Sequence, residues 1–157
     1  MEKVKPFGID FENDNYAENT VYGMAAVFSL IEKEVEEILK PYNLSTAKFN
    51  ALMIIKHQGG DDGLSQVEIG KKLIVTASNM TKLLDRLTKE NLIIREAQKG
   101  DRRVNIIKIT QKGSELLDEA WPSYLQKIKE LTGLLENQEL KQISEILGKW
   151  FEKLNKN

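Results

Sequence analysis

Apolar and polar positions follow a helical period through both ends of this 157-residue chain and change to a strand-like pattern only in its middle. The first helix is expected over residues 18–40, where Pro41 ends it, because proline disfavours helical backbone in the residue before it. A second helix, capped by Ser45 or Thr46, is expected to end at the glycines that follow His57. The apolar face of the first helix consists of Val21, Met24, Ala25, Phe28, Ile31, Val35, Ile38 and Leu39. The inward face of the second consists of Phe49, Leu52, Met53 and Ile55.

Two helices separated by a tight turn are expected next. The first covers Ser65–Leu73 and begins with a capping box, in which Ser65 is followed three residues later by Glu68. The second covers Thr76–Glu90, with Thr76 as its cap. The residues expected to face the core are Val67, Ile69 and Leu73 in the first helix and Met80, Leu83, Leu84 and Leu87 in the second. The opposite face of the second helix is small and polar, which suits close approach to the edges of bases.

A β-hairpin is expected directly after these helices, from the β-rich runs Leu92–Glu96 and Val104–Thr110. The polar sequence QKGDRR lies between the runs, where Gly100 lets the chain turn, and Leu64 is expected to add a short strand residue. A helix-turn-helix followed by a hairpin is a winged helix. Such a fold presents one helix to a major groove of DNA and a basic loop to the neighbouring backbone or minor groove.

The chain is expected to close with two further helices. One runs from Thr110 to about Leu131, with a kink or a break at Pro122, and the other is capped by Asn137. The helices at the two ends of the chain carry more apolar surface than a small winged lobe can cover, so we expect them to pair with those of a second copy. The alternative is that they pack within one chain. The residues expected at the dimer interface are Ile143, Ile146, Leu147, Trp150, Phe151 and Leu154.

The predicted fold class is therefore mainly α, of the α+β kind: a winged helix-turn-helix with an all-helical dimerisation region formed by the N- and C-terminal helices. Residues 1–17 are mostly polar and are expected to be flexible. Residues 18–45 and 111–157 would form the dimerisation region, and residues 46–110 the DNA-binding domain.

Charge is unevenly distributed along the chain, although the net charge is only −1. Residues 71–112 hold eleven Lys and Arg against four Asp and Glu, a net charge of +7, whereas residues 1–40 hold four against nine, a net charge of −5. A basic segment can simply be a solvated face. Its coincidence with the predicted winged helix instead favours binding to phosphates, with counterion release driving affinity.

Composition excludes several other classes of function. The chain has no cysteine, which rules out disulfides, thiolate zinc sites and thiol redox sensing. His57 is the sole histidine and belongs to no cluster of ligands, so no metal and no cofactor are expected. Neither a paired nucleophile and base nor a phosphate-cradling glycine loop occurs, which argues against an enzyme. A winged helix that binds protein would present a neutral or acidic face, unlike this basic segment.

No apolar run approaches the roughly 20 residues that span a bilayer, and the N-terminus has no apolar signal core. We therefore expect a cytoplasmic protein without a membrane partner.

The sequence IVTASNMTKLLDRLTKENLIIRE, followed by GDRRVNIIKITQKG, resembles the MarR (multiple antibiotic resistance regulator) family. Matching features are the long helix before the motif, the DRL of the second motif helix, the NLIIRE start of the hairpin and the Asp-x-Arg tip at Asp101 and Arg103. The exit from the hairpin, residues 109–113, also matches. The resemblance covers about residues 20–155. One departure from the family pattern is Ile74, at a position in the turn where the family commonly has glycine. A β-branched residue such as isoleucine resists the positive φ that glycine adopts.

This resemblance implies a homodimeric transcription regulator, usually a repressor, that binds a palindromic operator in double-stranded DNA. By position, Arg103 would enter the minor groove and Asp101 would hold its guanidinium, which suits the negative potential of a narrow groove. Arg102 would contact phosphate or support Arg103, and Lys99 belongs to the same wing. Candidates in the recognition helix are Thr76, Ser78, Asn79, Thr81, Lys82 and Arg86.

Within that set, Asn79 could read adenine and Lys82 guanine, while Thr76 and Ser78 would hold phosphate, although any of them could simply face solvent. In similar proteins, arginines at the positions of Arg86 and Arg95 often tie the helix to the wing.

The resemblance also implies release from DNA by a small aromatic or phenolic ligand bound in an apolar cleft. The residues that could line such a cleft are Met24, Phe28, Met53, His57 and Trp121. Methionines and aromatic residues at helical spacing are more often core, and a lone histidine is more often a surface residue. The sequence specifies neither the ligand nor the operator, and it leaves repression and activation open, with operator occlusion the simpler mechanism.

Overall fold

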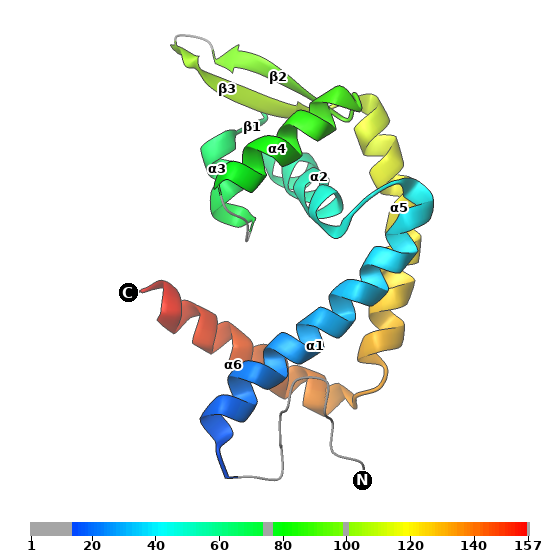
Figure 1. The fold of residues 1–157 in the computed structure, drawn as a ribbon, viewed down its shortest axis with the longest axis vertical. Helices are drawn as coiled ribbons and strands as arrows, with labels where there is room; N and C mark the ends of the chain where they lie inside the picture. The colour runs from blue at the N-terminus through cyan, green and yellow to red at the C-terminus, as the bar shows by residue number, and fades with distance from the viewer. Residues whose placement is uncertain (1–13, 74–76, 99–100, 157) are drawn as a thin grey trace. The chain divides into compact units, whose positions relative to one another are not determined.

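The computed structural model describes residues 14–73, 77–98 and 101–156, without the side chains of residues 77–78, 98 and 101–104. The chain divides into two compact units, residues 1–124 and residues 125–157. The helices are α1 (Tyr16–Leu39), the 3-10 turn η1 (Lys40–Tyr42), α2 (Thr46–Gly59), α3 (Gln66–Lys72), α4 (Ala77–Lys89), α5 (Gln111–Thr132) and α6 (Asn137–Asn155). The strands are β1 (Leu64–Ser65), β2 (Ile93–Gln98) and β3 (Asp101–Ile109) (Figure 1).

In the described part of the first unit, the strands form an antiparallel sheet in the order β1-β3-β2. Ile107 at the centre of β3 pairs with Leu64 on one side and Arg95 on the other. The expected short strand at Leu64 is therefore confirmed. Gly63 precedes it with a φ of 74°, and a Cβ atom there would lie 2.7 Å from the Ile107 carbonyl oxygen, so the turn into β1 requires glycine.

The core of this unit lies between the sheet and α2, α3, α4 and α5. Its largest fully buried side chains on these elements are Phe49, Leu52, Ile55, Ile69, Leu84, Leu87, Ile93, Ile107 and Leu117. Most of the predicted inward faces are confirmed, but Val67 is 67% exposed. Val67 lies two positions before the buried Ile69, a rotation of about 200° around the helix, so the two side chains cannot share one face.

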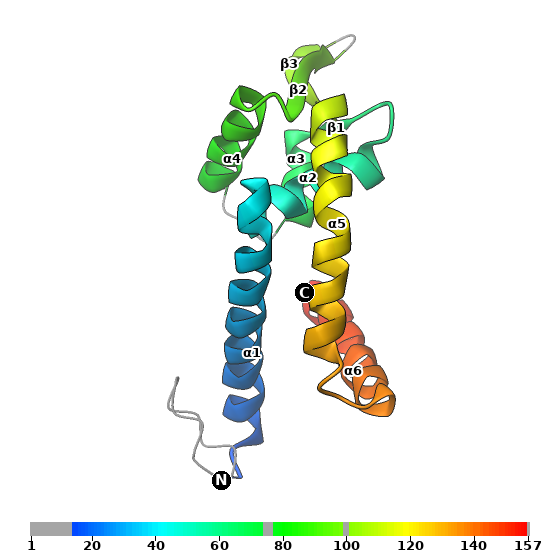
Figure 2. The same cartoon turned by 90° about the vertical axis from the view of Figure 1, so that its right-hand side faces the viewer.

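The large apolar side chains of helix α1 are buried only towards its C-terminal end. Val35 and Leu39 are buried, whereas Val21, Met24 and Phe28 of the predicted apolar face are exposed. Figures 1 and 2 show the N-terminal half of α1 extending away from the sheet and from α2, α3 and α4. The helix starts at Tyr16, capped by the Asn15 side chain, and so reaches into the segment that we expected to be flexible; residues 1–13 of that segment lie outside the described residues.

Helix α5 continues across Pro122 from Gln111 to Thr132, so the break that was one of the two expected outcomes does not occur. Aromatic contacts lie on both sides of the proline: the Phe49 ring centroid is 6.3 Å from that of Trp121 and 4.8 Å from that of Tyr124. These contacts hold the helix against α2 where one backbone hydrogen bond is lost.

The second unit contains the C-terminal part of α5 and the whole of α6. Glu136 is the N-cap of α6, instead of the expected Asn137, and its backbone N–H donates to the Glu139 carboxylate over 2.8 Å. Most apolar residues of α6, namely Ile143, Ile146, Leu147, Phe151 and Leu154, are exposed in the single chain, whereas Leu140 and Trp150 are half-buried. Among the described residues, no helix is both long and apolar enough to cross a membrane.

Candidate nucleic-acid interface

The first motif helix, α3, is fixed at its start by the expected capping box. The Ser65 N–H donates to the Glu68 carboxylate over 2.8 Å, and the Glu68 N–H donates to the Ser65 hydroxyl over 3.2 Å. The hydrogen bond from the Ser65 backbone, followed by that from its hydroxyl, lowers the pKa of Glu68, and Lys71 and Lys72 lower it further. The carboxylate therefore stays ionised at neutral pH, where it stabilises the N-terminus of α3.

The second motif helix, α4, has two sharply different faces. Its apolar side chains, Met80, Leu83, Leu84 and Leu87, are at most 9% exposed, as the sequence pattern predicts. Asn79, Thr81, Lys82 and Arg86 are all exposed. Ser78 lies in the first turn of α4 with its side chain undescribed, and Thr76 and Ile74 lie outside the described residues. The described part of the helix thus presents polar and cationic groups to solvent.

A hydrogen bond that local sequence patterns did not predict joins the two motif helices at their exposed side. The Gln66 Nε2 of α3 donates to the Thr81 Oγ1 of α4 over 3.0 Å. The two residues are fifteen positions apart, and no periodicity or capping signal connects them. Gln66 therefore lies beside a candidate base-contacting residue, and it was absent from the sequence-based candidates.

An ion pair connects α4 to the wing. The Arg95 Nη2 on β2 lies 2.6 Å from the Asp85 Oδ1 on α4. This is the tie that the family resemblance implied for Arg95, whereas Arg86 lies exposed in the last turn of α4. The pair also compensates the carboxylate of Asp85, which would otherwise repel phosphates beside Lys82 and Arg86.

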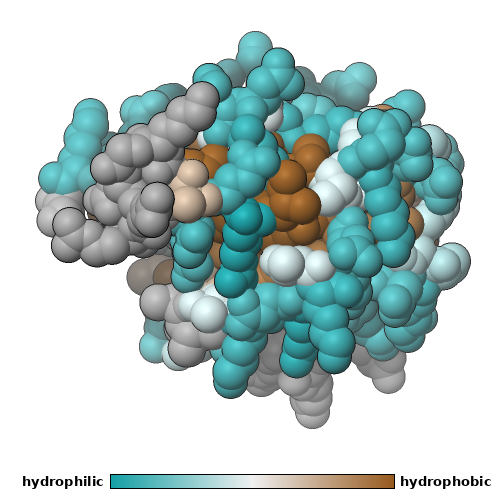
Figure 3. Space-filling view, turned by 90° about the horizontal axis from the view of Figure 1, so that it is seen from above, coloured by the Kyte–Doolittle hydropathy of each residue, from teal (hydrophilic) through white to brown (hydrophobic). Residues whose placement is uncertain are grey.

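The strands of the wing extend further towards its tip than we predicted. β2 continues to Gln98, which pairs with Asp101 at the start of β3, and the Lys108 Nζ lies 3.1 Å from the Glu96 Oε2 across the two strands. The backbone of Asp101, Arg102 and Arg103 is therefore strand, not loop; their side chains and all of Lys99 lie outside the described residues. Viewed from the end that carries the sheet, hydrophilic side chains surround an apolar area (Figure 3).

The candidate ligand residues are distributed over three helices. Met24 and Phe28 are exposed on α1, His57 is exposed near the end of α2, and Met53 and Trp121 are half-buried. Trp121 makes its ring contacts with Phe49 and Tyr124. A cleft formed by these five residues stays a prediction. In the described ranges, no group of three or more His, Cys, Asp or Glu is placed to hold a metal ion.

Comparisons with known proteins agree with this arrangement. The model of the MarR family matches residues 44–104. The HTH-type transcriptional regulator MhqR of Bacillus subtilis is 29% identical over 124 residues, which cover 79% of this chain and 83% of that protein. An uncharacterized HTH-type transcriptional regulator of Bacillus cereus is 32% identical over 114 residues, covering 72% of this chain and 74% of its own length.

Among solved structures, a variant of MarR from E.coli complexed with operator DNA superposes with a TM-score of 0.76 at 24% identity, covering 90% of this chain and 98% of that one. This likeness concerns the fold.

Proposed function

Because this chain belongs to the MarR family of transcriptional regulators, we propose that it binds a palindromic operator in double-stranded DNA as a homodimer and represses transcription until a small ligand releases it. The observation that carries the proposal is the two-sided helix α4, whose apolar side is buried and whose exposed side holds Asn79, Thr81, Lys82 and Arg86.

In the proposed complex, the exposed side of α4 lies in the major groove. Asn79 pairs with adenine and Lys82 with guanine, because an amide and an ammonium match the groove edges of these bases. Thr81 and Arg86 contact the same groove or its phosphates, and Thr76 and Ser78 hold phosphate at the start of the helix. The wing residues Lys99, Asp101, Arg102 and Arg103 contact the neighbouring minor groove and backbone. The net charge of +7 over residues 71–112 supports this orientation.

The proposed dimer rests on the apolar side of α6. Ile143, Ile146, Leu147, Phe151 and Leu154 are between 43% and 69% exposed within the single chain, and Trp150 is half-buried beside them. Contiguous exposed apolar surface of this kind marks an interaction site. A two-fold dimer would also present two copies of α4 to half-sites about 34 Å apart, one helical turn of DNA.

Repression by occlusion of the promoter is the simplest consequence of operator binding. The proposed ligand is a small aromatic or phenolic compound, held among Met24, Phe28, Met53, His57 and Trp121. An apolar site with a few polar anchors is typical for such compounds.

Fluorescence anisotropy with DNA selected by the protein from a random pool tests the central step. We expect tight, salt-dependent binding that exceeds binding to scrambled DNA, because specificity comes from base contacts and salt dependence from phosphate contacts. Lys82→Ala should lose about 1–3 kcal/mol of operator affinity. Lys33→Ala, which removes an exposed lysine of α1, is the matched control and should bind like the wild type. Equal weak binding to both DNAs would instead support a protein-binding winged helix.

A further inference from the structure

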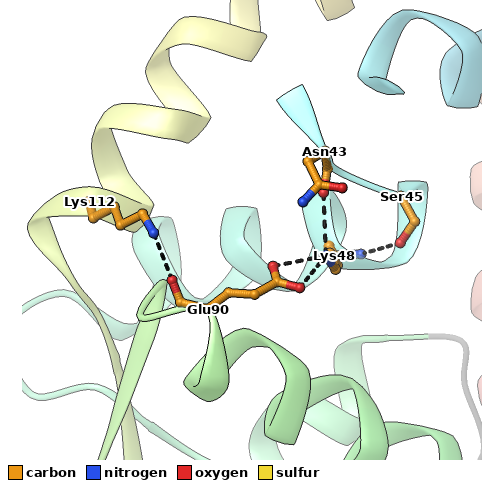
Figure 4. A network of polar contacts seen from close by, with 5 residues as sticks. All are labelled: Asn43, Ser45, Lys48, Glu90 and Lys112. Carbon is orange, nitrogen blue, oxygen red and sulfur yellow. Dashed lines mark hydrogen bonds and ion pairs between the residues drawn. The ribbon is translucent and has the colours of Figure 1, made fainter. Parts of the chain in front are cut away.

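The residue that follows the recognition helix, Glu90, connects three helices of the first unit (Figure 4). Both of its carboxylate oxygens accept from the Lys48 Nζ of α2, over 2.6 and 2.8 Å. The same Nζ donates to the Asn43 carbonyl oxygen over 3.3 Å. The Lys48 side chain is only 12% exposed. The ammonium is engaged by Glu90 and Asn43 in Figure 4, and with so little of the side chain exposed it is poorly placed to contact DNA phosphates.

Glu90 also lies in the backbone motif that ends α4. Asn91 has a φ of 57°, its N–H donates to the Thr88 carbonyl, and the Leu92 N–H donates to the Leu87 carbonyl over 2.9 Å. This is the pattern of a Schellman motif, with asparagine in the left-handed position. The Glu90 carbonyl accepts from the Lys112 Nζ over 2.9 Å, which satisfies a group that the end of a helix leaves without a partner.

The start of α5 packs directly against this turn. The Thr110 hydroxyl donates to the Asn91 carbonyl over 2.8 Å, and the Thr110 N–H donates to the Leu92 carbonyl over 3.0 Å. A Cβ atom at Gly113 would lie 2.1 Å from the Leu92 carbonyl oxygen, so this contact requires glycine. The C-terminal end of α4 is therefore held by α5 through the backbone and by α2 through the Lys48–Glu90 ion pair.

We infer that Lys48 is a positioning residue for operator recognition, which acts through Glu90 to set the orientation of α4. This inference rests on the function proposed above. The candidate base-contacting Asn79 precedes Glu90 by eleven residues, a distance of about 16 Å along a helix. A tilt of about 5° at Glu90 therefore moves Asn79 by about 1.4 Å, more than the roughly 0.5 Å that a functional constellation tolerates. The buried apolar side of α4 sets its depth against the core, and the ion pair sets its angle to α2.

The test compares Lys48→Met with wild type, using selected operator DNA and scrambled DNA over a salt series. We expect the ratio of operator affinity to scrambled affinity to fall by about tenfold. The affinity for scrambled DNA, and the slope of log affinity against log salt concentration, should stay unchanged, because no phosphate contact is removed. Lys48→Arg, which keeps a cation and its donors, should recover most of the ratio.

Lys56→Met is the matched control on the same helix. Lys56 is 22% exposed and its Nζ lies 2.5 Å from the Asp118 Oδ1 of α5, so it forms a comparable ion pair that does not reach α4. We expect Lys56→Met to lower the thermal midpoint of unfolding by about as much as Lys48→Met does, and to keep the wild-type ratio of operator affinity to scrambled affinity. If Lys48→Met fails to fold, Glu90→Gln replaces it and should lower the ratio by about threefold, because the neutral amide still accepts a weaker hydrogen bond.

The outcomes separate this inference from the proposed function. Selective wild-type binding together with an unchanged ratio in folded Lys48→Met, or an equal loss in Lys56→Met, overturns the positioning role and leaves the proposed function intact. A wild-type protein that does not prefer its selected DNA contradicts the proposed function, and with it the role of Lys48.

Discussion

Helices α4 and α6 both carry an apolar stripe, but of the two only the stripe of α4 is buried. Leu84 and Leu87 of α4 are fully buried, whereas Ile146, Phe151 and Leu154 of α6 are more than 60% exposed. The difference shows that helical amphipathicity reports that a face needs a partner and does not say where the partner lies. The sheet and the other helices of the first unit bury the apolar side of α4. In the proposed dimer, a second copy of the chain would bury the apolar side of α6.

Leu84→Ala should have the largest effect, because it empties a fully buried position under the recognition helix. We expect a loss of about 2–5 kcal/mol in the free energy of unfolding, measured by urea denaturation. Val67→Ala is the control, since that side chain is mostly exposed and should change stability by less than about 0.5 kcal/mol. Equal losses in the free energy of unfolding for Leu84→Ala and Val67→Ala would show that burial does not determine how much these side chains stabilise the fold.

Phe151→Ala should act on assembly and not on the fold of the single chain. If the exposed side of α6 is the dimer interface, the dissociation constant of the dimer should rise by about tenfold to a hundredfold, because aromatic side chains dominate interface energies. Sedimentation equilibrium over a concentration series measures this change. Glu152→Ala next to it provides an exposed polar control. A monomer–dimer equilibrium that Phe151→Ala leaves unmoved would favour an α6 that remains uncovered in solution.

Arg103→Ala tests whether the basic wing adds to the operator affinity that α4 is proposed to provide. We expect a loss of about 1–3 kcal/mol in operator affinity, with weaker binding to scrambled DNA as well, because the guanidinium is proposed to occupy the minor groove. Anisotropy on the folded dimer measures the loss, and Lys33→Ala again serves as control. Unchanged operator affinity would remove the wing from the interface and leave recognition to α4.

Ser65→Ala should have the smallest effect, at the capping box of α3. Hydrogen bonds from Ser65 hold the pKa of Glu68 below its ordinary value, so the stability that this ionised carboxylate contributes is complete above the ordinary value. It is lost as the pH falls through the lowered value in the folded protein. NMR titration should show the pKa of Glu68 moving part of the way back towards its ordinary value in Ser65→Ala, because alanine removes the hydroxyl hydrogen bond and keeps the backbone one. A pKa that does not move would assign the shift to the backbone N–H of residue 65, which alanine keeps, and to Lys71 and Lys72.

The winged-helix order of elements could be predicted because its signals are local. Ser65 and Glu68 are one helical turn apart, and the buried residues of α4 repeat every three or four positions, so neighbouring letters carry the information. The prediction that Val67 faces the core was wrong, although it used the same rule. In the seven-residue helix α3, the angular position of Val67 excludes it from the face of the buried Ile69. The local chain around Pro122 allowed a break, and aromatic packing against Phe49 accompanies the continuous α5.

The sequence by itself determined which segments are helical, which face of α4 is apolar, and that positive charge concentrates in residues 71–112. Only the tertiary structure decided which polar groups meet: Gln66 with Thr81, Asp85 with Arg95, and Lys48 with Glu90 across 42 positions. The physical reason is the sequence separation over which each kind of interaction acts. Caps and apolar periods arise from interactions within one or two helical turns, whereas an ion pair between α2 and the end of α4 exists only after the core has brought the two helices together.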